Sequence, residues 1–322
     1  MALDIDNIDK RILFELERNA RIPDVKLAKI VKKSKDAVRY RIRKLEKSGI
    51  IKGYKTWIDM TKLGYRAESI YLTLLNLPKR KEQLIKEIIN DKRTYWIGVA
   101  EGVWNIGITY FVKNNHELFE IKNHLLSKYD DLVIDMHVTS LVSVSVHEKI
   151  FLVKEKSSLI TFTEDQENID IDELSKKILG HLYRNSKANI VYIAEKCGTS
   201  IDVVRGRMRK MEKNGVIIRY TIDLDYRKIG YEFYKTFIYL KKYSKERINQ
   251  IMSYAEKSDT IINIVKQIAP WDFEFILFTK NFQEYNNAIS KFVEIFEIAI
   301  RKVETSAMSE DIIFPCKELI FE

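Results

Sequence analysis

The sequence predicts an α+β fold in which one unit occurs twice in tandem, each copy having a three-helix head followed by a βαββαβ domain. Two observations support this prediction. Shifting the chain by 166 residues aligns residues 3–65 with residues 169–231 without a gap, and 27 of these 63 positions are identical. Beyond both segments, strand-like and helix-like patterns alternate in the same order. A repeat of this length indicates the duplication of whole domains rather than a solenoid.

The head begins with three predicted helices. The third helix follows Ser34 in the first copy and Ser200 in the second, and these hydroxyls can cap the free amides of its first turn. It ends at Gly49 and Gly215, since glycine readily adopts the left-handed conformation that closes a helix. Apolar residues recur at helical spacing along all three segments. In the first copy they are Ile12, Leu13, Leu16, Val25, Leu27, Ala28, Val38, Ile42 and Leu45.

A small hairpin is expected after the third helix. The stretches IIKGYKTWID and VIIRYTIDLD are rich in β-branched and aromatic residues around a polar centre, which is typical of a short hairpin. Three helices followed by a hairpin define a winged helix-turn-helix. We therefore expect winged-helix DNA-binding domains at residues 1–60 and 169–226.

The remainder of each copy has the strand and helix order of a ferredoxin-like domain. We expect these domains at residues 61–153 and 227–322, joined by a polar linker at 154–168 without strand or helix periodicity. The predicted strands are 69–75, 94–100, 106–113 and 132–145, then 235–240, 260–268, 273–279 and 298–309. The predicted helices are 81–90 and 116–127, then 245–257 and 282–292.

Charge is concentrated in the two heads. The whole chain has a formal net charge of +9, whereas residues 1–60 carry 16 Lys+Arg against 9 Asp+Glu and residues 169–226 carry 11 against 8. These segments contribute +7 and +3, so the rest of the chain sums to −1. A basic excess confined to two short segments points to two contacts with a polyanion.

Several function classes are disfavoured by composition. Neither an apolar run of bilayer length nor a secretory signal is visible, so we expect a cytoplasmic protein without a membrane partner. Cys197 and Cys316 are too few for a disulfide framework and are expected in the core. The five histidines lack metal-ligand spacing, and phosphate loops, dinucleotide fingerprints and nucleophile elbows are missing. We therefore expect no metal, no cofactor and no enzymatic activity.

The third helix of each head offers a surface suited to DNA. An α-helix fits the major groove, where arginine can bind guanine through two parallel hydrogen bonds and other cations can hold phosphates. A merely solvated face is the alternative, but caps, frame and local charge agree in both copies. The predicted contacts to double-stranded DNA are Lys35, Asp36, Arg39, Tyr40, Arg41, Arg43, Lys44 and Lys47, then Ile201, Asp202, Arg205, Arg207, Arg209, Lys210 and Lys213.

Two segments are similar to a known family of transcription regulators. They are LDIDNIDKRILFELERNARIPDVKLAKIVKKSKDAVRYRIRKLEKSGII and the matching segment that begins IDIDELSKKIL. Both resemble the winged helix of the Lrp/AsnC (feast/famine) family, in which an α/β sensor domain forms dimers. The resemblance implies an intramolecular pseudo-dimer with the sensor sheets packed together and the heads spread apart. Larger homo-oligomers are an open expectation, because family members form rings.

The resemblance also raises a small-molecule effector, an amino acid in this family. The central strands of the two sensor domains are joined by EGVWNI and IAPWDF, which align Trp104 with Trp271 and Asn105 with Asp272. These four residues lie where the family places its effector. The alternative is that the tryptophans pack a sheet against its partner, and this alternative is favoured.

Two other functions remain as alternatives. Siroheme decarboxylases resemble Lrp-type proteins and depend on histidine and arginine in the central strands, but TYWIGVAEGVWNIGITYF and TIINIVKQIAPWDFEFILF contain neither. A protein-interaction adaptor of the transcription machinery is the second alternative, which the less basic second head favours. A DNA-binding regulator with unlike half-sites is the preferred hypothesis, because the heads differ at Lys35 and Ile201 and at Tyr40 and Gly206.

Overall fold

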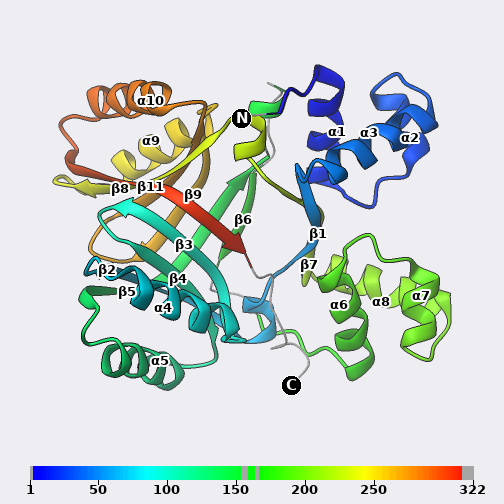
Figure 1. The fold of residues 1–322 in the computed structure, drawn as a ribbon, viewed down its shortest axis with the longest axis horizontal. Coiled ribbons are helices and arrows are strands. Elements are labelled where there is room, and N and C mark those ends of the chain that lie inside the picture. Colours follow the sequence, from blue (N-terminus) through cyan, green and yellow to red (C-terminus); the bar gives the residue numbers. More distant parts are fainter. Residues whose placement is uncertain (1–2, 149, 154–158, 164–166, 314–322) are drawn as a thin grey trace.

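The computed structural model describes residues 3–148, 150–153, 159–163 and 167–313. Both heads contain the three expected helices. Head 1 consists of α1 (Asn7–Arg18), α2 (Asp24–Ile30) and α3 (Lys35–Lys47), and head 2 of α6 (Glu173–Arg184), α7 (Ile190–Lys196) and α8 (Ile201–Lys213). Figure 1 shows both heads on the right of the molecule, beside a large barrel formed by the sensor domains.

The predicted caps of the third helix are confirmed in both heads. Ser34 accepts a hydrogen bond from the Ala37 amide at 3.2 Å, and Ser200 accepts one from Val203 at 3.3 Å. Gly49 and Gly215 follow these helices with φ angles of +70° and +71°, the left-handed region that side chains rarely adopt. Local sequence therefore fixes where both helices begin and end.

The predicted wing hairpins are wrong. Each stretch forms one strand, β1 (Ile51–Ile58) and β7 (Ile217–Leu224), and the two strands pair with each other antiparallel. A hairpin within ten residues would need a tight turn with positive φ, and Gly53 lacks a positive φ. The backbone groups are satisfied by the other copy instead. Lys55 lies opposite its equivalent, Thr221, so a pseudo-twofold axis passes through this pair.

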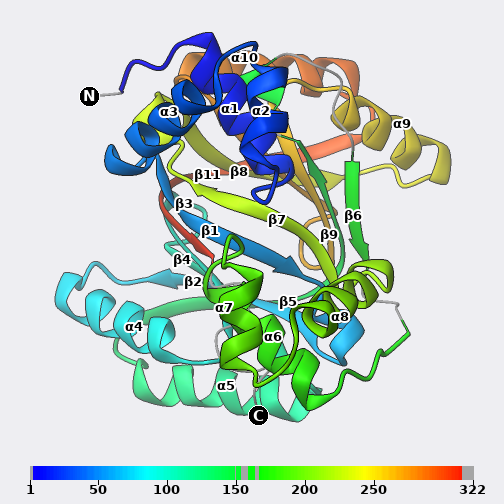
Figure 2. The same ribbon diagram turned by 90° about the vertical axis from the view of Figure 1, so that its right-hand side faces the viewer.

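Each head packs on the strand contributed by the other copy. Helix α1 contacts β7, and α6 contacts β1. Figure 2 looks onto the heads and shows the β1–β7 ribbon running between them. The heads also contact each other: Arg21 donates from Nη1 to the carbonyl oxygens of Ser186 and Ala188 at 2.6 and 3.0 Å. They are thus less widely separated than expected.

The ferredoxin-like order is confirmed in both sensor domains. Sensor domain 1 contains β2 (Arg66–Leu74), α4 (Pro78–Asn90), β3 (Thr94–Gly102), β4 (Ile106–Val112), α5 (Asn115–Lys128) and β5 (Val133–His147). Sensor domain 2 contains β8 (Glu232–Leu240), α9 (Lys245–Glu256), β9 (Ile261–Ile268), β10 (Phe273–Thr279), α10 (Phe282–Ile295) and β11 (Ile300–Ile313). Short 3₁₀ helices η1 (Thr61–Leu63), η2 (Ile150–Leu152) and η3 (Arg227–Ile229) lie in the connections.

The two sensor sheets join edge to edge rather than packing face to face. The strand order is β2-β4-β3-β11-β8-β10-β9-β5, and β5 also pairs with β2, which closes a ring of eight strands. The joins between copies are β3 with β11 and β5 with β9. Closure pairs the strand edges that two separate sheets would leave open.

The predicted linker contains a strand. Residues Leu159–Thr163 form β6, which pairs with the end of β5, whereas 154–158 and 164–166 lie outside the described residues. Cys197 is half-buried against the head core, and Cys316 lies outside the described residues. Within the described ranges, no group of side chains could hold a metal ion. None of the described helices has the length and apolar character needed to cross a bilayer.

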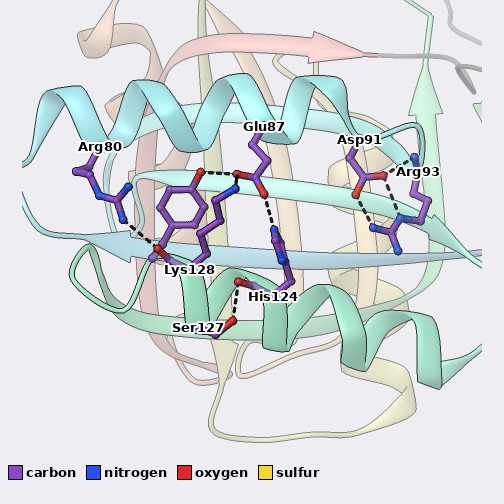
Figure 3. Close-up of polar contacts among 8 residues, drawn as sticks. Arg80, Glu87, Asp91, Arg93, His124, Ser127 and Lys128 are labelled. Carbon is purple, nitrogen blue, oxygen red and sulfur yellow. Dashed lines mark hydrogen bonds and ion pairs between the residues drawn. The ribbon is translucent and has the colours of Figure 1, made fainter.

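The two sensor domains hold their outer helices together by different chemistry. Between α4 and α5, Glu87 accepts a hydrogen bond from the Tyr129 hydroxyl at 2.6 Å, pairs with Lys128 at 2.8 Å and contacts His124 (Figure 3). At the equivalent place between α9 and α10, Tyr254 packs against Phe292 with ring centroids 5.6 Å apart. The same helix pair is therefore joined by charge in one copy and by aromatic contacts in the other.

Candidate nucleic-acid interface

Helices α3 and α8 each bury one face and expose the other. Val38, Ile42 and Leu45 are buried in head 1, and Val204, Met208 and Met211 are buried at the same positions in head 2. Most of the predicted DNA contacts are exposed. The exposed ones are Lys35, Asp36, Arg39, Tyr40, Arg43, Lys44 and Lys47, and Asp202, Arg205, Arg209, Lys210 and Lys213. Tyr40 is a large aromatic residue among them, with 71% of its surface exposed.

Two predicted contacts face the protein instead. Arg41 is paired with Asp6 and Asp9 at the start of α1, at 2.7 and 2.8 Å, and Arg207 is paired with Asp172 at the start of α6. The hydrogen bonds that the Arg41 guanidinium donates to Asp9 and Asp6 raise its pKa. Residues three or four apart lie on the same face of an α-helix. These arginines lie on the face of the third helix that contacts the first helix, and their ion pairs hold the two helices together. Their expected contact with DNA finds no support in this geometry.

The first turns of α3 and α8 differ in charge. Arg39 is tied to Asp24 on α2 at 2.6 Å, whereas position 190 of head 2 is an isoleucine and Arg205 lies 3.4 Å from Asp202 on its own helix. Ile201 is half-buried and packs against the head core. Because Ile201 stands at the position of Lys35, head 2 offers one cation fewer at the start of its third helix.

The basic face of α3 borders an open hollow beside head 2. The hollow has a volume of about 400 Å³ and is lined by Arg39, Arg43 and Glu46 from α3 and by Lys187 from head 2. Lys187 lies over the Tyr54 ring at 4.6 Å, and its equivalent Arg21 lies over Tyr220 at 5.4 Å. Cations from both heads thus approach the ribbon between them.

The four candidate effector residues have structural contacts. The Asn105 side chain accepts from the Leu74 amide at 2.8 Å, and Asp272 accepts from Leu240 at 2.7 Å. Trp104 and Trp271 are 2% and 3% exposed. Both lie 5.2 Å from the Tyr71 ring inside the barrel. These contacts favour the packing interpretation, and effector binding stays a prediction.

A buried polar network inside the barrel was not predicted. Lys235 pairs with Glu274 at 2.6 Å, with side chains only 6% and 1% exposed. Tyr71 donates to Glu274 at 2.8 Å, and Gln267 donates to Glu274 at 3.0 Å. Burial and the neighbouring Glu274 raise the pKa of Tyr71 well above its ordinary value.

Further polar contacts inside the barrel also join the two copies. Thr139 donates to Gln267 at 3.0 Å, and Trp96 donates to Asp311 at 2.6 Å. The Lys235 ammonium lies 3.8 Å from the Trp96 ring centre, a cation–π contact. Only the alternation of strand residues could have hinted at these partners, since their pairing depends on the register between distant strands.

Fold and surface together define a class: paired winged-helix domains carried on a ferredoxin-like barrel. A family model for winged helix-turn-helix DNA-binding domains matches residues 5–52 and 171–218. The transcriptional regulator LrpA of Pyrococcus abyssi is 33% identical over 132 residues, which cover 39% of this chain and 89% of LrpA. Regulatory protein AsnC of Haemophilus influenzae is 30% identical over 125 residues, which cover 38% of this chain and 75% of AsnC. The chain belongs to the Lrp/AsnC-like winged helix-turn-helix family.

The fusion of two units also has a structural counterpart. The crystal structure of the siroheme decarboxylase NirDL matches 95% of this chain and 92% of its own, with a TM-score of 0.66 and 13% sequence identity. Its complex with an iron-uroporphyrin III analogue matches 98% and 96%, with a TM-score of 0.67. At this identity, the likeness establishes a shared fold alone.

Proposed function

We propose that this chain is a sequence-specific DNA-binding transcription regulator that acts as a fused pseudo-dimer. The observation that carries the proposal is the pair of exposed basic helices, α3 and α8, related by the pseudo-twofold axis of the ribbon. Duplex DNA presents half-sites related by such an axis, and dimeric helix-turn-helix proteins place one recognition helix in each. Transcription regulators among the relatives, LrpA and AsnC, support the same function.

Arg43 and Arg209 are the best candidates for base contacts. They occupy equivalent positions, both are exposed, and neither has an ion-pair partner among the residues that the structure describes. An unpaired guanidinium can bind guanine O6 and N7 together, whereas Arg39 must first leave Asp24. Lys44, Lys47, Lys210 and Lys213 supply phosphate contacts further along each helix.

We propose two unlike half-sites, because equivalent positions on the third helices differ between the heads. Lys35 and Tyr40 of head 1 correspond to Ile201 and Gly206 of head 2. A lysine holds phosphate, whereas an isoleucine offers only an apolar contact such as that with a thymine methyl group. A strictly symmetric best site in random-sequence selection would contradict this part of the proposal.

We also propose that the chain has no siroheme decarboxylase activity, despite the shared fold. The strands β3, β4, β9 and β10 carry neither histidine nor arginine, the residue types on which those enzymes depend. The barrel beside these strands is filled by Tyr71, Trp96, Trp104, Phe237 and Trp271. Titration with siroheme tests this proposal: an unchanged visible spectrum supports it, and a saturable spectral shift with loss of carboxyl groups overturns it.

A protein-binding role for head 2 is the second candidate function. Its α7 and α8 expose Val191, Tyr192 and Val203, which are 54%, 47% and 40% accessible. Exposed apolar residues gathered on two neighbouring helices suit contact with a protein partner. In that case head 2 would bind part of the transcription machinery while head 1 holds DNA.

Capture of sheared genomic DNA by the purified chain at physiological salt, followed by sequencing, tests the main proposal. We expect a few promoter-region sites with two unlike half-sites. The matched control is R43A combined with R209A, which should lose these sites while keeping the circular dichroism of the parent. Weak, salt-sensitive capture without enriched sites would contradict sequence-specific binding. Retention of a protein partner at high salt would then favour the adaptor function.

A further inference from the structure

Two equivalent lysines each contact the recognition helix of the other copy. Lys228, in η3 of the second copy, donates from Nζ to the Ser48 carbonyl at 2.8 Å. Lys62, in η1 of the first copy, donates to the Asn214 carbonyl at 2.9 Å. Ser48 and Asn214 are the C-caps of α3 and α8. The lysines therefore reach across the pseudo-twofold axis to the ends of the two DNA-facing helices.

The backbone carbonyls of the same two lysines also bind the segment that leads into each head. The Lys228 carbonyl accepts from the Leu3 amide at 2.6 Å, just before α1, and the Lys62 carbonyl accepts from Ile169 at 2.6 Å, before α6. Each lysine thus contacts one head at two points, its entrance and the end of its recognition helix. Both contacts occur in each copy with matching distances, so they are a symmetric feature of the pseudo-dimer.

Each lysine ammonium is a suitable partner for the C-terminal end of a helix. The last carbonyls of a helix lack partners within it and carry partial negative charge, which a lysine neutralises. Gly49 and Gly215 make room for the side chains: a Cβ would lie 2.4 Å from Lys228 Nζ at Gly49 and 3.0 Å from Lys62 Nζ at Gly215. A Cβ at Gly49 would force the end of the Lys228 side chain to shift, and a Cβ at Gly215 would press against the end of Lys62.

The position of the lysines in the chain links barrel and head. The segment η1 connects β1 of the ribbon to β2 of the barrel, and η3 connects β7 to β8 in the same way. Each lysine therefore sits where one copy passes from ribbon to barrel and contacts the recognition helix of the other copy. The contact thereby joins the recognition helix of one copy to the ribbon–barrel junction of the other.

We propose that Lys62 and Lys228 are positioning residues that fix the separation and angle of α3 and α8, and thereby the spacing at which two DNA half-sites are bound. The part concerning DNA rests on the proposed function, whereas the part concerning helix position does not. The packing of α1 on β7 and of α6 on β1 keeps the first helix of each head attached to the ribbon without these lysines, but it does not fix the ends of α3 and α8. Removing the ammonium groups therefore loosens the recognition helices and leaves the fold intact.

The first test measures helix position without DNA. Spin labels on cysteines introduced at Lys47 and Lys213, in a background with Cys197 and Cys316 changed to serine, report the distance between the two helix ends. We expect a narrow distance distribution in the parent and a broad one in K62M combined with K228M. The double variant K62R with K228R should restore the narrow distribution, and K79M, on an exposed lysine of α4, serves as the control. An unchanged narrow distribution in the methionine variant would overturn the proposal.

The second test measures half-site spacing. The duplexes carry the two selected half-sites at separations varied through one helical turn, which is about 10–10.5 base pairs. The parent should prefer one spacing, and the methionine variant should bind it roughly tenfold more weakly, about 1.4 kcal/mol, with similar affinities at other spacings. A variant with broadened distances but an undiminished spacing preference would overturn the role in DNA spacing. Broadened distances in a protein that binds no specific DNA would overturn the proposed function and support the positioning role.

Discussion

Head 1 and head 2 share their internal contacts and most of the exposed cations of the third helix, but they differ at the start and on the outer face of that helix. Ser34 and Ser200 cap the third helices, and Arg41 and Arg207 tie them to the first helices. The equivalent positions of the third helices that differ include Lys35 and Ile201, and Tyr40 and Gly206. The frame and most exposed cations have stayed the same in both copies, while a few positions of the third helix have diverged.

The sensor domains have diverged in their interiors as well. Ser69 and Gly107 of the first copy correspond to Lys235 and Glu274 of the second. Trp96 occupies space beside Gly107, where a Cβ would lie 2.8 Å from its ring. The barrel interior therefore combines small residues from one copy with charged residues from the other. Two identical copies could not form this arrangement.

Breaking the buried pair should have the largest effect. Lys235→Met leaves Glu274 without its cation in the barrel, and loss of one partner of a buried pair costs about 3–5 kcal/mol of unfolding free energy. Ser69→Ala, at the equivalent position, removes one hydrogen bond to Thr109 and should cost about 0.5–1.5 kcal/mol. Denaturant unfolding measures both values. Equal losses of unfolding free energy in the two variants would contradict the prediction that the buried charged pair of the second copy contributes more to stability than the equivalent residue of the first.

The comparison of heads is sharpened by single arginine variants. Arg43→Ala and Arg209→Ala should each weaken specific binding by about 1–3 kcal/mol, the usual worth of a good base contact. Each variant should relax base preference in only one half-site, because the two arginines belong to different heads. Binding curves on duplexes with one altered half-site measure this. A loss of preference in both half-sites from one substitution would contradict the independent heads.

The charged contact between α4 and α5 should make this helix pair acid-sensitive, whereas the Tyr254–Phe292 contact between α9 and α10 carries no charge. Although partial burial opposes it, contacts with Lys128, Tyr129 and His124 lower the pKa of Glu87 from 4.5 to about 2. The stabilisation is therefore fully present above pH 4.5 and is lost as the pH falls toward 2. Because the carboxylate is partly exposed, about 1 kcal/mol is expected.

Unfolding of Glu87→Gln between pH 6 and pH 2, set beside the parent, measures this contribution. The two proteins should differ above the ordinary pKa of glutamate and converge in acid. Tyr254→Phe, at the equivalent position of the second copy, is the control and should leave the pH profile of the parent unchanged. A constant difference between Glu87→Gln and the parent at every pH would show that Glu87 acts by packing alone.

The smallest effect is expected for Asp24→Asn. Its ion pair with Arg39 is exposed, with side chains 28% and 47% accessible, and such pairs contribute at most about 1 kcal/mol. Thermal unfolding should change by only a few tenths of a kcal/mol. Binding of the head 1 half-site should strengthen slightly, because Arg39 is released and a negative charge is removed. Weaker binding would show that the pair presents Arg39 to DNA.

Local sequence predicted the elements but not the contacts between the copies. The helices, their serine caps and the glycine stops depend on neighbours a few residues away, so spacing alone revealed them. Pairing of β1 with β7, the lysine contacts of Lys62 and Lys228, and the Lys235–Glu274 pair depend on the register between segments far apart in the chain. Arg41 was misplaced for the same reason, since its partners lie on another helix.

The closed ring of eight strands has a consequence for how the protein behaves on dilution. A regulator made of two separate chains loses its pairing as its concentration falls, because association follows mass action. Here both partners of the ring belong to one chain, so the pairing of α3 with α8 is a unimolecular property. Even a single molecule carries both heads in their mutual arrangement, and neither head can be exchanged for that of a related protein.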